Sequence, residues 1–356
     1  MSEPDRTFVN LTDDPAQGRS ARRIYVRRAV MKNYHKRRRQ QTGGQREPAT
    51  TSYPEPIVAH PVTLQMHQFY PFEPRTSHIS QMSRVVIQFL CGQITKAAQD
   101  VTYVPFIHRL FAEGILRADA QDSQDSHSAP KINSLKQCQL LLQEHGFQDE
   151  ATDVSQSVLW SKVHEHQEWI YAQHESFDKW ELLSAAQAIT LYLLLRMKLG
   201  RNHVKFPYGD IALLFTLGRI FRIIQISHLN PIYASGHPPD WENWIFCESC
   251  FRTATVYFIL TVFFSMDIGL PCDSPSDWKM DDLPVPATKG LWSAGDAANW
   301  ARSSSTPYLP RQLKLGDLLP SNRLPQLPIE TWKESTDEMG LLVAMAMDLR
   351  IATSEE

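Results

Sequence analysis

The segment WELLSAAQAITLYLLLRMKL, residues 180–199, decides the fold of this chain. Its leucine, isoleucine and alanine side chains lie on nearly every side of the helix that its length and composition predict. A helix that is apolar almost all round is buried when it belongs to a globular protein. We therefore predict that residues 180–199 form the central helix of a large core.

The surrounding sequence predicts further helices. Apolar residues recur at spacings of three and four in 83–98, 103–116, 134–145, 155–174, 210–226 and 241–266. Strand signals are weak, because no Asn-Gly or Asp-Gly turn joins two alternating runs. Prolines such as Pro231 and Pro239 fall between the expected helices, and residues 117–130 read as a long exposed loop. The expected fold class is all-α, a large helical globule over residues 61–356 behind an arm and linker over residues 1–60.

The arm concentrates positive charge. Residues 19–39 contain ten basic side chains and no acidic one. Residues 1–50 carry a net charge of +7, which leaves −10 on the other 306 residues, because the whole chain carries −3. We expect this disordered or helical arm to bind an import receptor or the DNA backbone, the alternative being a solvated tail without a partner. The residues proposed for import or phosphate contact are Arg22, Arg23, Arg27, Arg28, Lys32, Lys36, Arg37, Arg38 and Arg39.

No motif for enzymatic chemistry is visible. The chain has only 15 glycines and lacks a G-x-S-x-G elbow, a Gly-rich phosphate loop and a dinucleotide fingerprint. We therefore expect that the chain is not an enzyme and that it binds no cofactor. The apolar run at 254–266 is shorter than the roughly twenty residues that span a bilayer, and the apolar residues of the arm do not line one face. We therefore expect no membrane partner.

Two groups of side chains resemble metal ligands. Cys247 and Cys250 form a C-x-x-C inside an expected helix, without a second pair at zinc-ligand spacing. We interpret them as reduced core thiols. His164, His166 and His174 share one expected helix but lack the H-E-x-x-H spacing, which favours a surface cluster. No metal site is expected.

Five segments occur in an order that resembles one family. They are residues 8–11 followed by the arm, 187–195, 241–253, 283–300 and 332–341. Glu248 and Arg252 in the third stand four residues apart on one expected helix, which favours an ion pair. Together the segments resemble the fungal-specific transcription factor domain, in the group of fungal regulators labelled tachykinin-family proteins. The resemblance spans nearly the whole chain.

The resemblance implies a nuclear transcriptional regulator of a secondary-metabolite pathway. The chain departs from the family in two ways. It lacks the six-cysteine zinc cluster with which many such regulators bind DNA, and Phe251 stands where many members have an arginine, which suggests a lost surface contact. Two alternatives stay open. One is a non-DNA-binding interaction module that acts through another transcription regulator, and the other is an enzyme of the same pathway.

Overall fold

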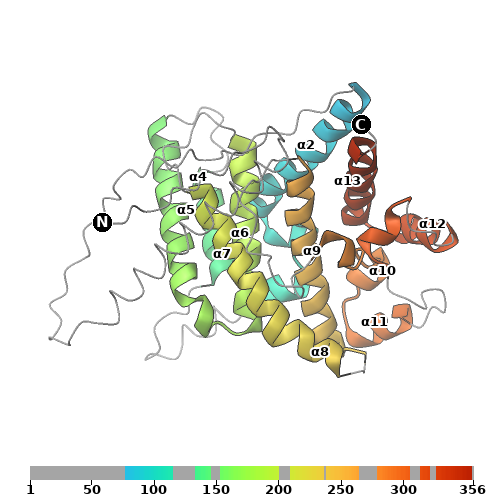
Figure 1. The fold of residues 1–356 in the computed structure, drawn as a ribbon. Coiled ribbons are helices and arrows are strands. Elements are labelled where there is room, and N and C mark those ends of the chain that lie inside the picture. Colours follow the sequence, from blue (N-terminus) through green and yellow to red (C-terminus); the bar gives the residue numbers. More distant parts are fainter. Residues whose placement is uncertain are drawn as a thin grey trace, which may run out of the picture. The chain divides into compact units, whose positions relative to one another are not determined.

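Helix α6 (Lys179–Leu199) lies at the centre of the fold (Figure 1). Every residue from Leu182 to Arg196 is buried, so the prediction of a central core helix is confirmed. Burial on all sides follows from its neighbours, because helices surround it. These are α2 (Ser77–Gln99), α4 (Ser134–His145), α7 (Gly209–Ile223) and α9 (Trp241–Phe263).

The structure is a computed structural model that describes residues 77–114, 133–145, 153–199, 209–235, 238–263, 279–304, 313–320 and 326–354. All of them fall within one compact unit, residues 66–356. This described part is 85% helical and contains no strand, which confirms the all-α prediction. The basic arm, the predicted boundary after residue 60 and the whole expected loop at 117–130 lie outside the described residues.

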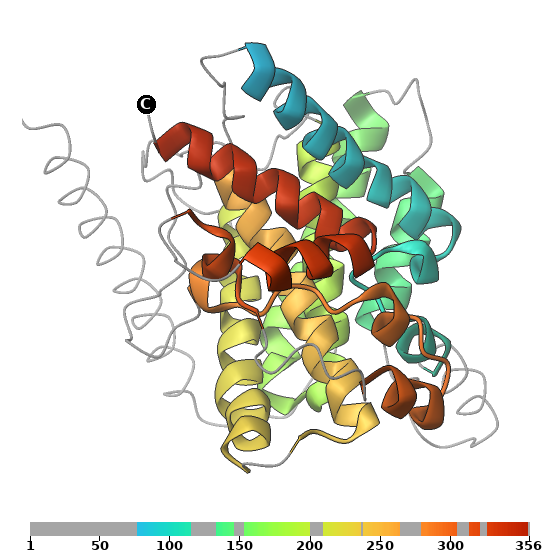
Figure 2. The same ribbon diagram turned by 90° about the vertical axis from the view of Figure 1, so that its right-hand side faces the viewer.

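The remaining helices complete two sides of the core. Helix α5 (Asp153–Gln173) packs against α4 and α7, and η3 (His174–Ser176) follows it. Helix α13 (Glu338–Ser354) packs against α2 and α9, as Figure 2 shows. Between α9 and α13 the chain forms short elements, namely η5 (Met280–Asp282), α10 (Lys289–Trp292), α11 (Ala297–Ser304), η6 (Leu315–Leu318) and α12 (Gln326–Ser335).

The helix expected over 103–116 is interrupted. A 3-10 turn, η1 (Val101–Tyr103), is followed by the irregular segment 104–108, and helix resumes at 109–114. Pro105 explains the break, because proline lacks an N–H and forces the preceding residue out of the helical region. Val104 accordingly has φ −85° and ψ 124°. The prediction of one continuous helix is wrong here, and segment 104–108 proves to line the site described below.

The break expected near Pro231 is absent. Helix α7 continues through a π-helical segment, η4 (Ile224–Leu229), into α8 (Asn230–Ala234). Pro231 lies in the first turn of α8, where proline is tolerated. Wide π turns allow helical conformation to persist past a site where α-helical hydrogen bonds fail. Pro231 therefore lies inside a helical rod that runs to Ala234.

Two described helices are long and apolar enough to cross a membrane, and sequence analysis identified neither as such. They are Lys179–Leu199, whose most apolar window is 83% buried inside the protein, and Ala212–Ala234, whose window is 44% buried. The first is the core helix α6, and its burial accounts for its composition.

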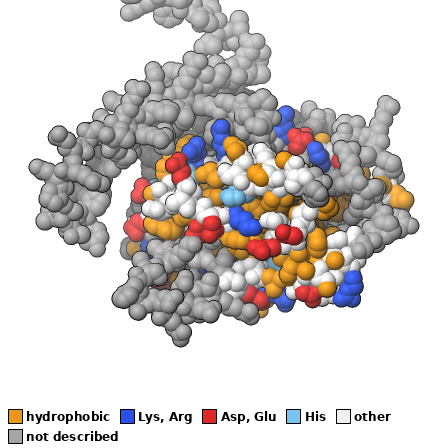
Figure 3. Space-filling model, turned by 90° about the horizontal axis from the view of Figure 1, so that it is seen from below, with side chains coloured by type: hydrophobic (Ala, Val, Ile, Leu, Met, Phe, Trp, Pro, Cys, Tyr) orange, Lys and Arg blue, Asp and Glu red, His pale blue; other side chains and the backbone are white. Residues whose placement is uncertain are grey.

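One face of the described part mixes side-chain types. Figure 3 shows a face on which acidic, basic and apolar side chains alternate, and its described residues form no continuous basic patch. Eight large apolar side chains of the described part are exposed. Two of them, Tyr103 and Leu341, lie at the site below.

Candidate functional site

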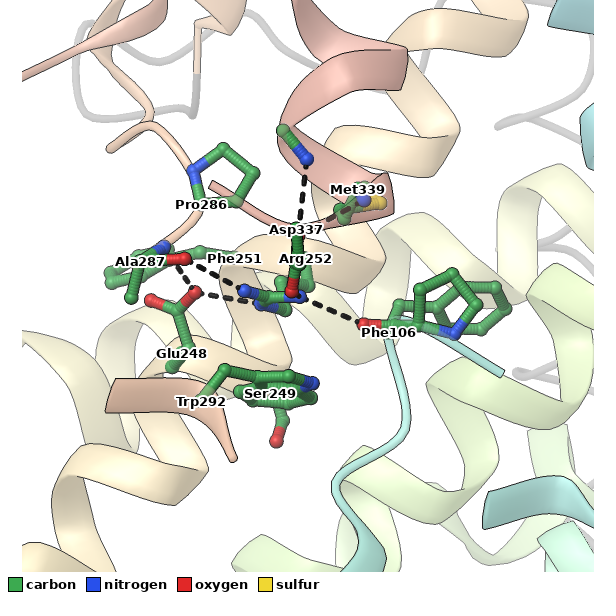
Figure 4. Close-up of polar contacts among 12 residues, drawn as sticks. Phe106, Glu248, Ser249, Phe251, Arg252, Pro286, Ala287, Trp292, Asp337 and Met339 are labelled. Atoms are coloured by element: carbon green, nitrogen blue, oxygen red, sulfur yellow. Dashed lines mark hydrogen bonds and ion pairs between the residues drawn. The ribbon is translucent and has the colours of Figure 1, made fainter. Parts of the chain in front are cut away.

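A fully buried arginine joins four segments of the chain (Figure 4). Arg252 of α9 donates through Nε to Glu248 Oε1 at 2.8 Å. Its Nη1 donates to the carbonyl of Pro105 at 3.0 Å and to Asp337 Oδ2 at 2.7 Å. Its Nη2 donates to the carbonyl of Ala287 at 3.0 Å. We call Arg252, Glu248 and Asp337 the arginine cluster; it ties α9 to the 104–108 segment, the chain before α10 and the start of α13.

Both carboxylates of the arginine cluster have further partners. Glu248 Oε1 also accepts from the backbone N–H of Ala287 at 2.7 Å. Asp337 Oδ1 accepts from the N–H groups of Met339 at 3.0 Å and Gly340 at 3.2 Å, and so caps α13. The positive end of the helix dipole stabilises this carboxylate further. Each buried charge is therefore paired with an opposite charge and hydrogen-bonded, as buried charges require.

Two more buried side chains brace the same segments. Gln187 of α6 donates through Nε2 to the carbonyl of Phe106 at 3.0 Å. Trp332 of α12 donates through Nε1 to the carbonyl of Pro286 at 2.8 Å. Irregular backbone carbonyls next to the arginine cluster thus receive donors from neighbouring helices, which lets these loops be buried.

Trp292 and His108 extend the arginine cluster toward the surface. The Arg252 guanidinium lies 4.0 Å from the centroid of the Trp292 ring, a cation–π contact. His108 donates through Nε2 to the carbonyl of Trp292 at 3.1 Å, because a carbonyl only accepts. Burial lowers the pKa of His108 to about 4; the hydrogen bond to Trp292 opposes this shift and the charges of Arg252 and Arg109 reinforce it. His108 is therefore neutral at pH 7, and its Nδ1 is an acceptor.

A pocket of about 620 Å³ lies beside the arginine cluster. Its walls come from eight residues of the segment 102–110, from α10 with the two residues after it, and from the start of α13. Pro105, Trp292 and Asp337 belong both to this pocket and to the contacts of Arg252. Small-molecule sites have volumes of roughly 300–1,000 Å³, so the pocket has the size of one.

The predicted ion pair and the predicted core thiols are confirmed. The Glu248–Arg252 ion pair forms as the spacing predicted. Cys247 and Cys250 are buried core thiols without a disulfide. Burial raises the pKa of the Cys247 thiol to about 12 and that of Cys250 well above its ordinary value, so both stay protonated. Within the described ranges, no group of three or more His, Cys, Asp or Glu side chains is placed to hold a metal ion.

Two predictions are wrong. His166 and His174 do not belong to a surface cluster, because they are only 7% and 5% exposed. His166 Nδ1 instead shares a 2.7 Å hydrogen bond with the hydroxyl of Tyr192 in the core. Phe251 is 8% exposed, so the phenylalanine fills a buried position, and no surface contact is lost there.

Sequence reasoning missed His108, Lys289 and the pairing of Asp337 with Arg252. Pro105 was the signal for the irregular segment that presents His108. An aspartate just before an apolar helical pattern was the signal for the cap on α13. Nothing local marks the pairing itself, since Asp337 and Arg252 are 85 residues apart.

Comparisons with known proteins identify no relative. No protein-family model matches the chain, no curated protein matches it, and no solved structure matches it. The resemblance to the fungal-specific transcription factor domain therefore rests on the quoted segments alone.

Proposed function

We propose that the chain is a fungal transcriptional regulator, of a biosynthetic pathway, that works in the nucleus. The basic arm serves nuclear import and contact with DNA phosphates, and the helical body receives a regulatory signal. One observation carries the proposal. The four body segments behind the resemblance are far apart in sequence, yet they meet around Arg252, through Gln187, the Glu248–Arg252 pair, Ala287 with Trp292, and Trp332 with Asp337.

This convergence supports an architectural role for the resembling motifs. Glu248 and Asp337 are both bound to a guanidinium and to backbone N–H groups. A general acid or base needs an atom free to exchange a proton with a substrate, and these carboxylates are engaged inside the protein. The motif residues therefore specify how the segments pack, which favours a regulatory body over an enzyme.

The charge distribution supports contact with DNA through the arm. Residues 51–356 carry a net charge of −10, which repels a polyanion, whereas residues 1–50 carry +7. No cysteine precedes Cys91, so the arm cannot build a zinc cluster. We therefore propose phosphate contact without base readout.

The second candidate is an interaction module that does not bind DNA and pairs with another transcription regulator. The missing zinc cluster favours it, because sequence-specific recognition would then come from the partner. In that case chromatin occupancy would depend on the helical body and persist without the arm. The proposed function predicts the opposite dependence.

Chromatin immunoprecipitation of the tagged chain separates the two. We expect occupancy with the intact chain and its loss when residues 1–50 are deleted, provided that a heterologous import signal restores nuclear entry. Occupancy retained without the arm would instead support the interaction module. No occupancy with the intact chain would contradict the proposal that it binds DNA.

Import is tested by fluorescence microscopy of a tagged chain. Changing the two basic blocks to alanine should move the fusion to the cytoplasm, because an import receptor binds positive charge and a tagged chain of this size diffuses slowly. Exchanging each arginine for lysine in the same blocks is the matched control and should preserve nuclear accumulation. Unchanged accumulation of the alanine variant would overturn the import role. The substituted residues are Arg22, Arg23, Arg27, Arg28, Lys36, Arg37, Arg38 and Arg39.

A further inference from the structure

The charged side chains that line the pocket beside the arginine cluster are unequally engaged. Asp337 is bound to Arg252 at 2.7 Å, and Glu338 is bound to Lys96 at 3.1 Å. By contrast, the side-chain ammonium of Lys289 forms no hydrogen bond or ion pair with any described residue, and Lys289 is exposed. Among the residues that the structure describes, the Arg109 side chain forms an ion pair only with Glu113, at 3.7 Å, and 62% of it is exposed. The charge left available in the pocket is therefore positive.

Two large apolar side chains of the pocket lining are exposed to solvent. Tyr103 and Leu341 are 59% and 56% exposed, and both line the pocket, as does Trp292. Large apolar side chains gathered at an exposed site mark binding surfaces, since water contact with them is unfavourable. The pocket thus combines an apolar wall with two available cations.

The pocket wall also contains two buried polar atoms without a hydrogen-bond partner among the described residues. They are His108 Nδ1 and Thr336 Oγ1. His108 itself is only 3% exposed, and its other ring nitrogen is used by the Trp292 carbonyl. Buried polar groups are nearly always hydrogen-bonded in native proteins. Other buried side-chain atoms of the described part, such as Gln93 Oε1 and Ser249 Oγ, lack a partner as well, so these two atoms supply polar groups to the wall but do not by themselves mark a binding site.

We propose that this pocket binds a small organic anion with an apolar body. The acidic group lies between Arg109 and Lys289, and the apolar part lies against Tyr103, Trp292 and Leu341. A volume of about 620 Å³ exceeds what an inorganic anion fills and matches a drug-sized molecule. Only the regulatory meaning of this binding rests on the proposed function: the anion would be the signal that the helical body receives.

The pocket is lined by residues that contact Arg252, so a bound ligand would act on the buried arginine cluster. Trp292 contacts the Arg252 guanidinium, and Asp337 both caps α13 and binds Arg252. A ligand that displaces Trp292 or Asp337 would change how α9 packs against α13. Binding can therefore change the surface that these two helices present.

Two fluorescent dyes test the ligand chemistry on the purified full chain. 8-Anilinonaphthalene-1-sulfonate carries an aromatic body and an anionic group, and N-phenyl-1-naphthylamine carries the same body without the anion. We expect saturable binding of the sulfonate to the folded chain. The Arg109→Glu and Lys289→Glu double variant should weaken it about tenfold, which corresponds to about 1.4 kcal/mol, and should leave the neutral dye within about twofold.

The matched control reverses two exposed cations outside the pocket, Arg84→Glu with Lys333→Glu, and should leave both dyes unchanged. All four positions are exposed, so we expect both double variants to fold, as near-ultraviolet circular dichroism will show. Leu341→Ser should weaken both dyes, because it removes part of the apolar wall.

Three outcomes would overturn the proposal. They are absence of saturable sulfonate binding, equal weakening in the pocket and control double variants, and sulfonate binding that is unchanged in the pocket variant. The titration uses purified protein without DNA, so its failure is distinguishable from a failure of the import or chromatin experiments.

Discussion

Replacing Arg252 with methionine tests the arginine cluster most directly, because methionine keeps the apolar stem and removes the charge. Glu248 and Asp337 have side chains only 3% and 11% exposed, and the variant leaves both without their counter-charge. The carbonyls of Pro105 and Ala287 lose a donor as well. Removing one partner of a buried ion pair costs about 3–5 kcal/mol.

The retained backbone bonds limit the loss. Glu248 keeps the N–H of Ala287, and Asp337 keeps its two bonds to the first turn of α13. We therefore expect the free energy of unfolding to fall by about 4 kcal/mol. Urea denaturation followed by tryptophan fluorescence measures it, and with a slope of about 3 kcal/mol per molar the midpoint should fall by about 1.3 M. Adding Glu248→Gln should recover about 1–2 kcal/mol, because it removes one unpaired charge and keeps the acceptor.

The control is Lys162→Met. The ion pair of Lys162 with Glu144 has the same 2.7 Å separation as that of Arg252 with Asp337, but its side chains are 41% and 58% exposed. Exposed pairs contribute about 0–1 kcal/mol, so this variant should barely move the midpoint. If Arg252→Met and Lys162→Met shifted stability equally, the reasoning that burial makes the arginine cluster strong would be refuted.

Three further predictions concern the core, the buried histidines and the arm. Leu191→Ala and Leu194→Ala should each lower the unfolding free energy by about 2–5 kcal/mol in the same urea assay, because both side chains are fully buried; a change below about 0.5 kcal/mol would contradict their burial. Burial lowers the pKa of His108 and His166 from 6.5 to about 4, so the unfolded chain binds more protons between these values. The stability that comes from burying neutral histidines is complete above pH 6.5 and is lost as pH falls toward 4, by about 3 kcal/mol for each histidine. Urea unfolding at pH 7, 6 and 5 measures the loss, and His166→Gln should flatten the dependence of the unfolding free energy on pH. A flat dependence for the unmodified chain would contradict the burial of neutral histidines. If about five basic residues of the arm contact phosphates, affinity for unrelated DNA duplexes should fall with salt with a logarithmic slope of about −4 to −5, and deletion of residues 1–50 should abolish binding; a sequence preference that survives high salt would demand base readout by the body.

Local patterns predicted the helices well, because apolar spacing reports directly on which face is buried. The bounds expected for α4 are those observed, and the all-round apolar α6 proved to be the core. The ion pair of Glu248 with Arg252 was equally predictable, since both residues lie on one helix.

The rest of the site depends on contacts that no local pattern encodes. The carbonyls of Pro105 and Ala287 became acceptors because irregular backbone passes Arg252, 147 and 35 residues away in sequence. His166 looked like a surface residue because its helix also carries polar side chains; the hydroxyl of Tyr192 on another helix explains its burial. Pro105 interrupts residues 103–116, but the regular apolar spacing of that segment still predicted one continuous helix.

The arginine cluster has a consequence for the order in which the chain can fold during synthesis. Arg252 is made before Ala287 and 85 residues before Asp337. At roughly 5–20 residues per second, the ribosome needs about 4 to 17 s to supply that last partner. Throughout this interval the guanidinium has to stay in water, because it lacks the full set of bonds that allows its burial. We therefore expect α9 to dock late on the nascent chain, after the start of α13 has emerged, and its apolar second half to need protection by a chaperone until then.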